Sequence, residues 1–577
     1  MIHKVTRLHI FLFCMAFCQR GFSQTLTENN RPRGYFQWPL PLNAAIAGNF
    51  GELRPNHFHM GLDCRTEKKQ NQPVWAAAAG YIAKIKIEPY GFGRCIYINH
   101  PNGLTTVYAH LNDFNPDLEK YVTAEQYRLK SWRLFIDVPA HLFPVLKGQQ
   151  IALSGNTGGS QAPHLHFEIR DTKTEKVLNP LLFGFPIPDT VAPVITRLAV
   201  YDRSISTYEQ SPTIYALKKV NGVYTTIPPL ITSSAGSISF AIGAIDRYTG
   251  SSSSNGIFEA RLSDNEKPVI SFKLDNISYD ETRYLNAHID YKLRNSGGPF
   301  VEHLSELPGY PNGIYKKISG DGVISIADDS AHTIKITVKD TEGNTSLLQF
   351  QIQRVPSIPV KVKTDSLARF QRSGFHPGFI NIYENSNISC ILPENCLYDS
   401  IRFQYREIAS NTGFPVYQLH NPTVPVHSYF PVKIKASIPD GLKDKVVMQR
   451  YWNAKNDFEK AVPVPGQNNW YKASFRDFGN FQLMIDTIPP TISPVGFKEG
   501  MNCSKLTSLK FVVADNTKDI QRFTATLDGQ WLRFSNDKGR TFVYVFDERC
   551  MAGEHELKIV AEDQVGNKTE KVYHFVR

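Results

Sequence analysis

One pattern occurs twice in this chain, and it constrains the fold more than any other feature. The segment AHTIKITVKDTEGNTS at 331–346 matches EHELKIVAEDQVGNKT at 554–569 at a constant offset of 223 residues. Each copy joins an alternating run, typical of a half-buried strand, to an Asp-x-x-Gly-Asn turn. The runs SISFAIGAID at 237–246 and SLKFVVAD at 508–515 are also alike. Two immunoglobulin-like β-sandwiches, ending near 355 and 577, are the simplest explanation.

Two proline-rich joints mark where β domains begin. FPIPDTVAPVI at 185–195 and DTIPPTISP at 486–494 share the form Asp-Thr-x-x-Pro followed by β-branched residues. Proline fixes φ and cannot donate a hydrogen bond to a sheet, so both joints indicate linkers. The stretch 357–485 between the two sandwiches has short alternating strands and many aromatic residues, but no motif that gives its type. With 577 residues, the chain is too long for a single core.

Only one stretch predicts a helix. NPDLEKYVTAEQYRLKSWRLF at 115–135 offers Asn115 as N-cap and Pro116 in the first turn, with Leu118, Val122 and Leu129 near helical spacing. We expect an insertion at about 115–140 that contains this helix. The fold class is therefore mostly β. The expected parts are a signal peptide at 1–23, a first domain at 34–186, an Ig-like β-sandwich at 187–355, a β-rich domain at 357–485 and a second Ig-like β-sandwich at 486–577.

The N-terminus has the layout of a secretory signal peptide. A basic start, MIHKVTR, precedes the apolar run LHIFLFCMAFC, and small residues follow at Gly21 and Ser23. The alternative is a membrane anchor, but the apolar run is about half the length that a bilayer requires. We therefore expect cleavage after Ser23, an exported protein, and no transmembrane segment afterwards.

Export changes what the cysteines indicate. Six cysteines follow the expected cleavage site, and an even number in an oxidising compartment favours disulfides. Their positions suggest three bonds: Cys64–Cys95, Cys390–Cys396 and Cys503–Cys550. The alternative is that all six are buried free thiols. The net charge of +10 is spread over 64 basic and 54 acidic residues without a basic block, so nothing favours nucleic acid as a partner.

Two histidine clusters point to one chemical site. In HLH, His164 and His166 are two residues apart, so on a strand both side chains leave the same face. In HFHMGLD, His59 and Asp63 are four apart, which also gives one face of a strand. A third alternating run, GLTTVYAH, ends at His110. Two imidazoles and one carboxylate, with a fourth position open, form a catalytic zinc arrangement, and two further histidines could assist it.

These motifs resemble a known family. HFHMGLD, VYAHL and SGNTGGSQAPHLHFEIR, in this order, are similar to the LytM/lysostaphin-type zinc metalloendopeptidases, which cut peptide bonds in peptidoglycan. The resemblance extends over about 34–186. It implies that His59, Asp63 and His166 bind one zinc ion. It also implies that His110 and His164 hold and activate the water and stabilise the tetrahedral intermediate.

The resemblance implies an antiparallel β peptidase domain, followed here by two or three β-sandwich domains. The leading interpretation is an exported zinc endopeptidase acting on peptidoglycan peptides in the periplasm or outer envelope of a Gram-negative bacterium, with the C-terminal β domains contacting other envelope proteins. One alternative is a non-cleaving regulator that binds the wall or activates another wall hydrolase. Another is a peptidase whose substrate is a protein. The insertion is expected to form a wall or lid of the groove.

Overall fold

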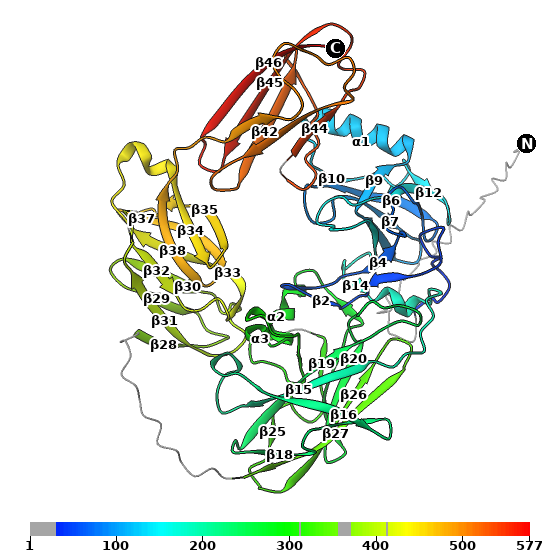
Figure 1. Cartoon of the computed structure of the whole chain (residues 1–577), viewed down its shortest axis with the longest axis vertical. Helices are drawn as coiled ribbons and strands as arrows, with labels where there is room; N and C mark the ends of the chain where they lie inside the picture. Colours follow the sequence, from blue (N-terminus) through cyan, green and yellow to red (C-terminus); the bar gives the residue numbers. More distant parts are fainter. Residues whose placement is uncertain (1–30, 311–312, 356–370, 411–412, 540) are drawn as a thin grey trace, which may run out of the picture.

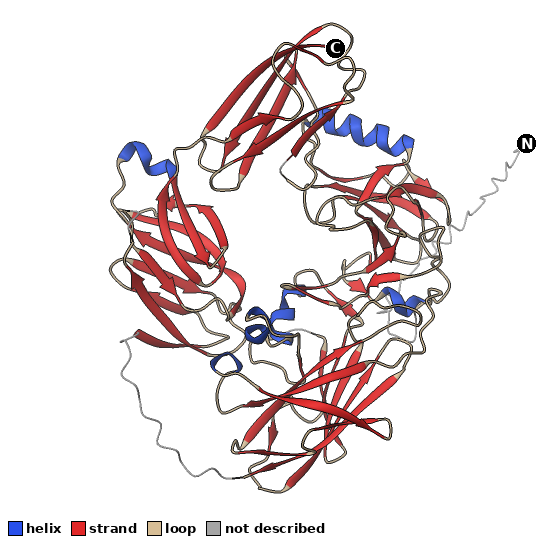
Figure 2. Ribbon diagram, viewed as in Figure 1, coloured by secondary structure: helices blue, strands red, loops and turns tan. Residues whose placement is uncertain are grey.

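The computed structural model describes residues 31–310, 313–355, 371–410, 413–539 and 541–577, so the predicted signal peptide at 1–23 lies outside the described residues. Strands dominate these ranges, which confirms the mostly β fold class. Figure 1 shows that the groups of strands follow one another around a ring, and that the C-terminal group returns to the helix of the first. Figure 2 shows how little of the chain is helical.

The first domain is built on an antiparallel sheet with the order β1-β4-β13-β8-β7-β6-β10 and a smaller sheet with the order β5-β12-β9. Its strands are β1 (Ile46–Gly48), β2 (Leu53–Arg54), β3 (His57–Phe58), β4 (Leu62–Arg65), β5 (Pro73–Trp75), β6 (Gly80–Ile87), β7 (Arg94–Asn99), β8 (Leu104–Ala109), β9 (Leu111–Phe114), β10 (Leu134–Asp137), β11 (Pro144–Val145), β12 (Gln150–Ser154), β13 (His164–Asp171) and β14 (Val177–Leu178). Val74 from the small sheet and Leu165 and Phe167 from the large sheet share one fully buried core.

The predicted helix is confirmed as α1 (Pro116–Leu129). Asn115 caps it, because its Oδ1 accepts a hydrogen bond of 3.0 Å from the backbone N of Leu118. Leu118 and Val122 are buried as expected, whereas Leu129 is 45% exposed and does not join the apolar face. The reason is its place in the last turn, directly before the left-handed cap at Lys130, where the chain leaves the helix.

The outer side of α1 packs against the C-terminal domain. Arg533 donates hydrogen bonds to Thr123 and Gln126 of the helix, at 3.1 and 2.8 Å. The ring of Tyr127 meets the ring of Trp531 edge-on, with centroids 5.2 Å apart. The inserted helix is therefore one of the elements that close the ring in Figure 1.

The second group of strands forms one continuous hydrogen-bonded path, β23-β19-β15-β16-β17-β27-β26-β20-β21-β24. Its strands are β15 (Val194–Asp202), β16 (Thr213–Val220), β17 (Val223–Thr226), β18 (Leu230–Ser233), β19 (Ser237–Ile245), β20 (Glu259–Asp264), β21 (Lys267–Lys273), β23 (Glu302–His303), β24 (Tyr315–Lys317), β25 (Ile324–Ser325), β26 (Ala331–Lys339) and β27 (Thr345–Arg354). β22 (Asn276–Ile277), from the same stretch of chain, pairs instead with β14 of the first sheet. Two short helices that the sequence did not predict lie here, α2 (Leu285–His288) and α3 (Tyr291–Asn295).

The third and fourth groups each comprise two sheets, β28-β31-β32-β38-β34-β35 with β29-β30-β33-β37-β36, and β39-β41-β44 with β40-β46-β45-β42-β43. The third group consists of β28 (Gln371–Phe375), β29 (Asn381–Glu384), β30 (Ile388–Leu392), β31 (Ile401–Ile408), β32 (Val416–Leu419), β33 (Pro425–Lys435), β34 (Val446–Trp452), β35 (Lys455–Lys460), β36 (Val462–Pro463), β37 (Trp470–Asp477) and β38 (Gly479–Ile485). The fourth consists of β39 (Thr491–Pro494), β40 (Met501–Asn502), β41 (Ser508–Ala514), β42 (Ile520–Leu527), β43 (Gln530–Trp531), β44 (Thr541–Val545), β45 (Glu554–Asp563) and β46 (Lys568–Val576).

The repeated segments form the same local structure in the second and fourth groups. β26 pairs antiparallel with β27, and β45 pairs antiparallel with β46, each pair joined at the Asp-x-x-Gly-Asn sequence. Burial alternates along β26 and along β45, as the sequence predicts. New strands also begin within both joints, at Val194 directly after Pro193 and at Thr491 directly after Pro490.

The three predicted disulfides are wrong. Cys64, Cys95, Cys390, Cys396, Cys503 and Cys550 are all free and buried. Cys64 lies on β4 and Cys95 on β7, and two strands separate them in the sheet order. Strands are about 4.8 Å apart, so the pair is separated by about 14 Å, well beyond the reach of a disulfide. No helix of the described ranges is long and apolar enough to cross a membrane.

Candidate metal centre

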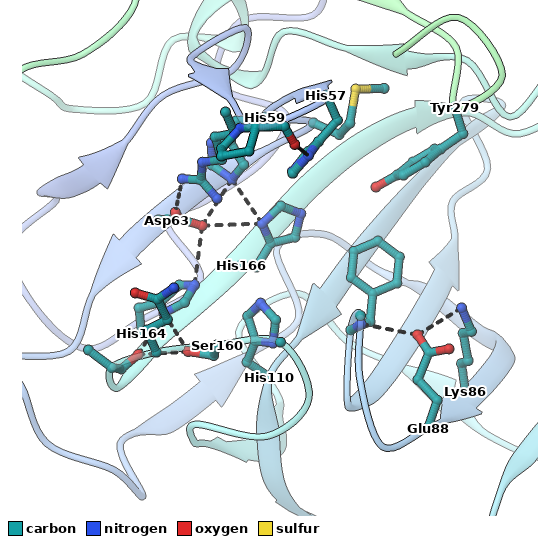
Figure 3. A pocket seen from close by; sticks show the side chains of 18 residues that line it. His57, His59, Asp63, Lys86, Glu88, His110, Ser160, His164, His166 and Tyr279 are labelled. Carbon is teal, nitrogen blue, oxygen red and sulfur yellow. Dashed lines mark hydrogen bonds and ion pairs between the residues drawn. The ribbon is translucent and has the colours of Figure 1, made fainter. Parts of the chain in front are cut away.

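Three neighbouring strands bring the predicted site residues together. β13 lies between β4 and β8, and in the register of these strands His166 is opposite both Asp63 and Ala109. His110 follows Ala109 directly, so it emerges beside His166 at the end of β8. Figure 3 shows Asp63, His110, His164 and His166 close together on these strands and at their ends.

His59 reaches the same point from a loop, which corrects the expectation that His59 and Asp63 lie on one strand. β3 ends at Phe58 and β4 begins at Leu62, with Gly61 in the step between them. A Cβ atom on Gly61 would lie 2.5 Å from the carbonyl oxygen of Phe167 and 2.9 Å from the ring of His166. Glycine is therefore required for the loop to approach β13 closely enough to place His59.

Three side-chain atoms converge in this space. His59 Nε2 lies 3.0 Å from Asp63 Oδ1. His166 Nδ1 lies 3.2 Å from the same oxygen and 3.1 Å from His59 Nε2. Each residue is at least nine-tenths buried. Together they form a group that could hold a metal ion.

The outer nitrogens of both histidines are held by hydrogen bonds. His59 Nδ1 donates to the carbonyl oxygen of Asn49 at 2.8 Å, and His166 Nε2 donates to Glu168 Oε1 at 2.9 Å. With its proton on the outer nitrogen, each neutral ring would present its lone pair at the inner nitrogen, where a metal would bind. Glu168 is itself fully buried and accepts hydrogen bonds from Arg170 and Tyr279.

The local charges are strongly coupled. Burial lowers the pKa of His59 to about 4, although Asp63 opposes this. Burial would also lower the pKa of His166, but hydrogen bonds to Asp63 and Glu168 raise it to about 9. The pKa of Asp63 stays well below its usual range despite burial, because three histidines surround it. Asp63 Oδ2 also accepts a hydrogen bond from Arg54. The cluster therefore keeps a carboxylate charged among imidazoles.

His110 and His164 face one another at the edge of the cluster. Their ring centroids are 4.8 Å apart. His110 Nδ1 donates to the carbonyl oxygen of Thr157 at 2.9 Å, and burial near the other histidines lowers its pKa to about 3. His164 Nδ1 donates to the carbonyl oxygen of Ala162 at 2.8 Å, and its Nε2 lies 3.2 Å from Asp63 Oδ1. All five residues predicted for the site are therefore adjacent in the structure.

These residues line a groove with a volume of about 740 Å³. Its other walls come from the β2–β3 hairpin, from residues 86–92 and from the loop 159–162, together with Tyr279 from the second group of strands. No residue of the insertion at 115–140, all of which is described, lines the groove. The expected wall or lid is thus absent, since the helix faces the C-terminal domain instead.

The second group of strands anchors the loop that carries His59. Phe58 is fully buried and belongs to the core shared with the second and third groups. The Oγ1 of Thr282 hydrogen-bonds to both the N and O of Phe58, at 3.0 and 3.2 Å. The phenylalanine between His57 and His59 therefore ties this side of the site to its neighbouring domain.

The C-terminal domain holds the opposite side. Asp537 Oδ1 accepts a hydrogen bond of 2.7 Å from the backbone N of Gly158. Lys538 Nζ donates to the carbonyl oxygens of Gly158 and Ser160, at 3.2 and 2.5 Å. Because Ser160 Oγ contacts His164 Nδ1 at 3.1 Å, the domain holds the loop next to His164.

Sequence reasoning missed Glu168 and Tyr279. Glu168 could have been predicted, because His164, His166 and Glu168 alternate along β13 and share one face. No sequence pattern pointed to Tyr279. It lies 111 residues from Glu168 along the chain and reaches it only through the contact between the first two domains.

Comparison with known proteins agrees with this geometry. Residues 57–127 match the model of peptidase family M23. The first domain is a peptidase family M23 domain, of the LytM/lysostaphin type. Residues 375–486 match the Zu5-like domain, which gives a type to the stretch that the sequence left unassigned.

Several curated relatives share the M23 region. An uncharacterized metalloprotease of Haemophilus influenzae is 31% identical over 163 residues, covering 27% of this chain and 28% of that protein. Cell division protein DipM of Caulobacter vibrioides is 30% identical over 144 residues, covering 25% and 19%. Peptidoglycan DD-endopeptidase ShyA of Vibrio cholerae is 27% identical over 143 residues, covering 24% and 27%. The chain thus spans less than a third of the length of these relatives.

Proposed function

We propose that this protein is an exported, zinc-dependent endopeptidase that hydrolyses peptide bonds in peptidoglycan cross-links or stem peptides. The observation that carries this proposal is the convergence of His59 Nε2, Asp63 Oδ1 and His166 Nδ1 in a groove that also exposes His110 and His164. The M23 family match and the relatives named as a metalloprotease and a peptidoglycan endopeptidase support it.

The donor set fits zinc. Two imidazole nitrogens and one carboxylate oxygen are the ligands of a catalytic zinc site with one position left for water or substrate. The hydrogen bonds from His59 to Asn49 and from His166 to Glu168 fix the tautomers that such a site requires. The chemistry that zinc would supply here is Lewis acidity, which polarises a carbonyl group and makes water a nucleophile near neutral pH.

The chain's own residues supply proton transfer and orientation. Because His110 donates from Nδ1 to Thr157, its Nε2 carries the lone pair and can accept a proton from the attacking water. His164 is oriented in the same way by Ala162, so its Nε2 is directed at the cluster. Because Nδ1 already carries a proton, His164 would have to be protonated on both nitrogens to donate a hydrogen bond from Nε2 to the negative charge that develops on the carbonyl oxygen.

The location follows from the same reasoning. Peptidoglycan lies outside the inner membrane, so a peptidase that acts on it must be exported. The relatives come from Gram-negative bacteria, which supports the periplasm or outer envelope. The C-terminal β domains would then position the groove, since Tyr279 and Lys538 contact its surroundings from two of them.

A non-cleaving regulator is the second candidate, and one observation favours it. Asp537 and Lys538 hold the loop beside His164 from outside the M23 domain, so the loop is not free to adapt to a peptide. One relative is named as a cell division protein rather than as a peptidase. The complete set of five site residues favours the enzyme.

Digestion of purified peptidoglycan separates the two. The zinc-loaded chain is incubated with sacculi, and the released fragments are read by mass spectrometry. The enzyme predicts new peptide ends from the wild-type protein and from a His141→Ala variant, whose altered side chain is exposed and away from the groove. It predicts none from His166→Ala. Intact sacculi with the wild-type protein would favour the regulator.

A further inference from the structure

Outside the M23 domain, three repeated sequence motifs each contain an aspartate, and the fold gathers these aspartates into two equivalent clusters. Asp189, Asp246 and Asp340 form one cluster, and Asp486, Asp515 and Asp563 form the other. In each cluster one carboxylate oxygen from every residue lies within 4.8 Å of the others. The first member comes from the proline joint, the second from the end of β19 or β41, and the third from the hairpin turn.

The third aspartate is held identically in both clusters. Asn344 Nδ2 donates to Asp340 Oδ2 at 2.7 Å, and Asn567 Nδ2 donates to Asp563 Oδ2 at 2.7 Å. The same amides reach back to the proline joints, to the carbonyl oxygens of Asp189 at 3.4 Å and Asp486 at 3.0 Å. The Asp-x-x-Gly-Asn turn therefore connects the hairpin to the entry linker of its own domain.

The other two aspartates of each cluster have carboxylate oxygens that no protein group satisfies. These are Asp189 Oδ2 and Asp246 Oδ1 in one cluster, and Asp486 Oδ2 and Asp515 Oδ1 in the other. Asp246 is only 2% exposed and Asp486 only 3%. A buried carboxylate oxygen without a hydrogen-bond partner lowers the stability of the folded state. Because such oxygens occur at equivalent positions in both clusters, we infer that a ligand is absent from each.

The neighbouring charges identify that ligand as a cation. The charged groups that act on Asp189, Asp246 and Asp515 are all other acidic residues. A bound cation would relieve the repulsion between these carboxylates.

We propose that each cluster binds one calcium ion. Its side-chain donors are carboxylate oxygens alone, which favour a hard cation rather than zinc. Calcium accepts six to eight oxygen ligands in flexible geometry, so water and backbone carbonyls can complete the shell around three carboxylates. An ion at each cluster would clamp the linker, the end of one strand and the hairpin turn together, and so fix how each domain follows the one before it.

The first of these sites also supports the M23 domain. Asp246 and Asn255 exchange backbone hydrogen bonds, at 3.0 and 2.9 Å, and the next residue, Gly256, exchanges two with the Asn49 side chain, at 2.9 and 2.8 Å. Asn49 is the residue whose carbonyl oxygen accepts from His59. Calcium at this cluster would therefore stabilise the segment that orients His59, whereas the second cluster has no such connection within the described residues.

Calorimetric titration of the zinc-loaded, signal-cleaved chain with calcium chloride tests the proposal. The wild-type protein is expected to bind two calcium ions. The double variant Asp246→Asn/Asp340→Asn should bind one, and so should Asp515→Asn/Asp563→Asn. Glu342→Gln and Asp519→Asn remove an exposed acidic charge that lies within four residues of Asp340 and Asp515 along the chain, and both variants should retain both ions.

Two further measurements keep the test independent of misfolding and of the proposed hydrolysis. The single variants Asp189→Asn and Asp486→Asn remove one half-exposed or buried ligand each and should weaken one of the two binding events at least tenfold, with circular dichroism unchanged. Magnesium should bind more weakly than calcium, because it demands near-ideal octahedral geometry. Absence of calcium binding, two ions in both double variants, or tighter binding of magnesium would overturn the proposal. None of these readouts requires peptidase activity.

Discussion

Three ligand atoms lie within 4.8 Å of one another in the histidine site of the M23 domain and in each aspartate cluster of the β domains. The two kinds of site differ in how well the protein itself stabilises them when no ion is bound. In the histidine site, each imidazole has a hydrogen-bond partner on its outer nitrogen, and one carboxylate lies among them. In the aspartate clusters, three like charges meet and buried oxygens have no partner. The first site is preorganised by the protein, whereas the clusters depend on the ion for their stability.

This difference predicts separate consequences for the loss of each ion. Removal of zinc should abolish hydrolysis and leave the arrangement of the domains intact. Removal of calcium should lower stability first and affect hydrolysis only indirectly.

The His59→Ala variant should lose peptidoglycan hydrolysis completely, because it removes a metal ligand. Elemental analysis should find no zinc, while calorimetry still finds two calcium ions. The His141→Ala variant serves as the control and should match the wild-type protein in both measurements. A His59→Ala protein that still cleaves would show that the metal is held elsewhere.

The His110→Ala variant should reduce kcat by about 10²–10⁴-fold, the usual contribution of a group that transfers a proton. Zinc content should remain at the wild-type level, since His110 is not a ligand in this account. Single-turnover kinetics and elemental analysis of the same sample would measure both. Loss of zinc together with activity would place His110 among the ligands instead.

The Glu168→Gln variant should weaken zinc affinity by about 10–100-fold, because the Glu168 carboxylate orients the His166 ring and places a negative charge beside it. Tyr279→Phe removes only the hydroxyl group that donates to Glu168, so its effect should be smaller. Competition with a chelating dye gives both affinities. Equal effects of the two variants would contradict the view that Tyr279 acts through Glu168.

Calcium should raise the melting temperature by several degrees, and more at pH 8 than at pH 5. Without calcium, Asp246 has a pKa of about 7 in the folded chain, against an ordinary value of 3.8. The folded state therefore binds more protons between these values, and the free energy of unfolding falls as pH rises from about 4 to about 7. Bound calcium keeps Asp246 ionised and so prevents this fall in the free energy of unfolding. Scanning fluorimetry at both pH values, in zinc-containing buffer with or without calcium, measures the difference, and an equal shift at both would contradict the account.

The Asp246→Asn/Asp340→Asn variant should weaken zinc affinity by less than about 10-fold, through the segment that leads to Asn49 and His59. The Asp515→Asn/Asp563→Asn variant should leave zinc affinity unchanged. The same dye competition detects this smallest effect. A larger loss in the second variant would reverse the assigned connection.

Local patterns in the sequence predicted much of this structure. The helix at 116–129 followed from its cap and first-turn proline, and the hairpins followed from the alternating runs before each Asp-x-x-Gly-Asn turn. The five site residues could be chosen because their motifs are short and specific. Glu168 was also readable, as the next residue on the face of His164 and His166.

The errors concern contacts between distant segments. The prediction that the insertion forms a wall of the groove was wrong, because the helix packs against Arg533 and Trp531 of the last domain, away from the groove. The proposed Cys64–Cys95 bond failed because strand order, which sequence proximity does not reveal, separates the two residues. No pattern in the sequence predicted that Phe58 is buried in a core shared with the neighbouring domains. The repeated aspartates were visible as motifs, but only the fold shows that they meet.

The most direct test of the central contrast is peptidoglycan digestion after removal of each ion. The zinc-loaded chain is either treated with 1,10-phenanthroline, which binds zinc, or dialysed into a calcium-free buffer that contains zinc. Each treatment is followed by restoration of the matching ion, and the released fragments are identified by mass spectrometry. The account predicts that phenanthroline abolishes the new peptide ends, that zinc restores them, and that removal of calcium lowers the melting temperature while cleavage continues. Cleavage that survives phenanthroline and the His166→Ala substitution would contradict it.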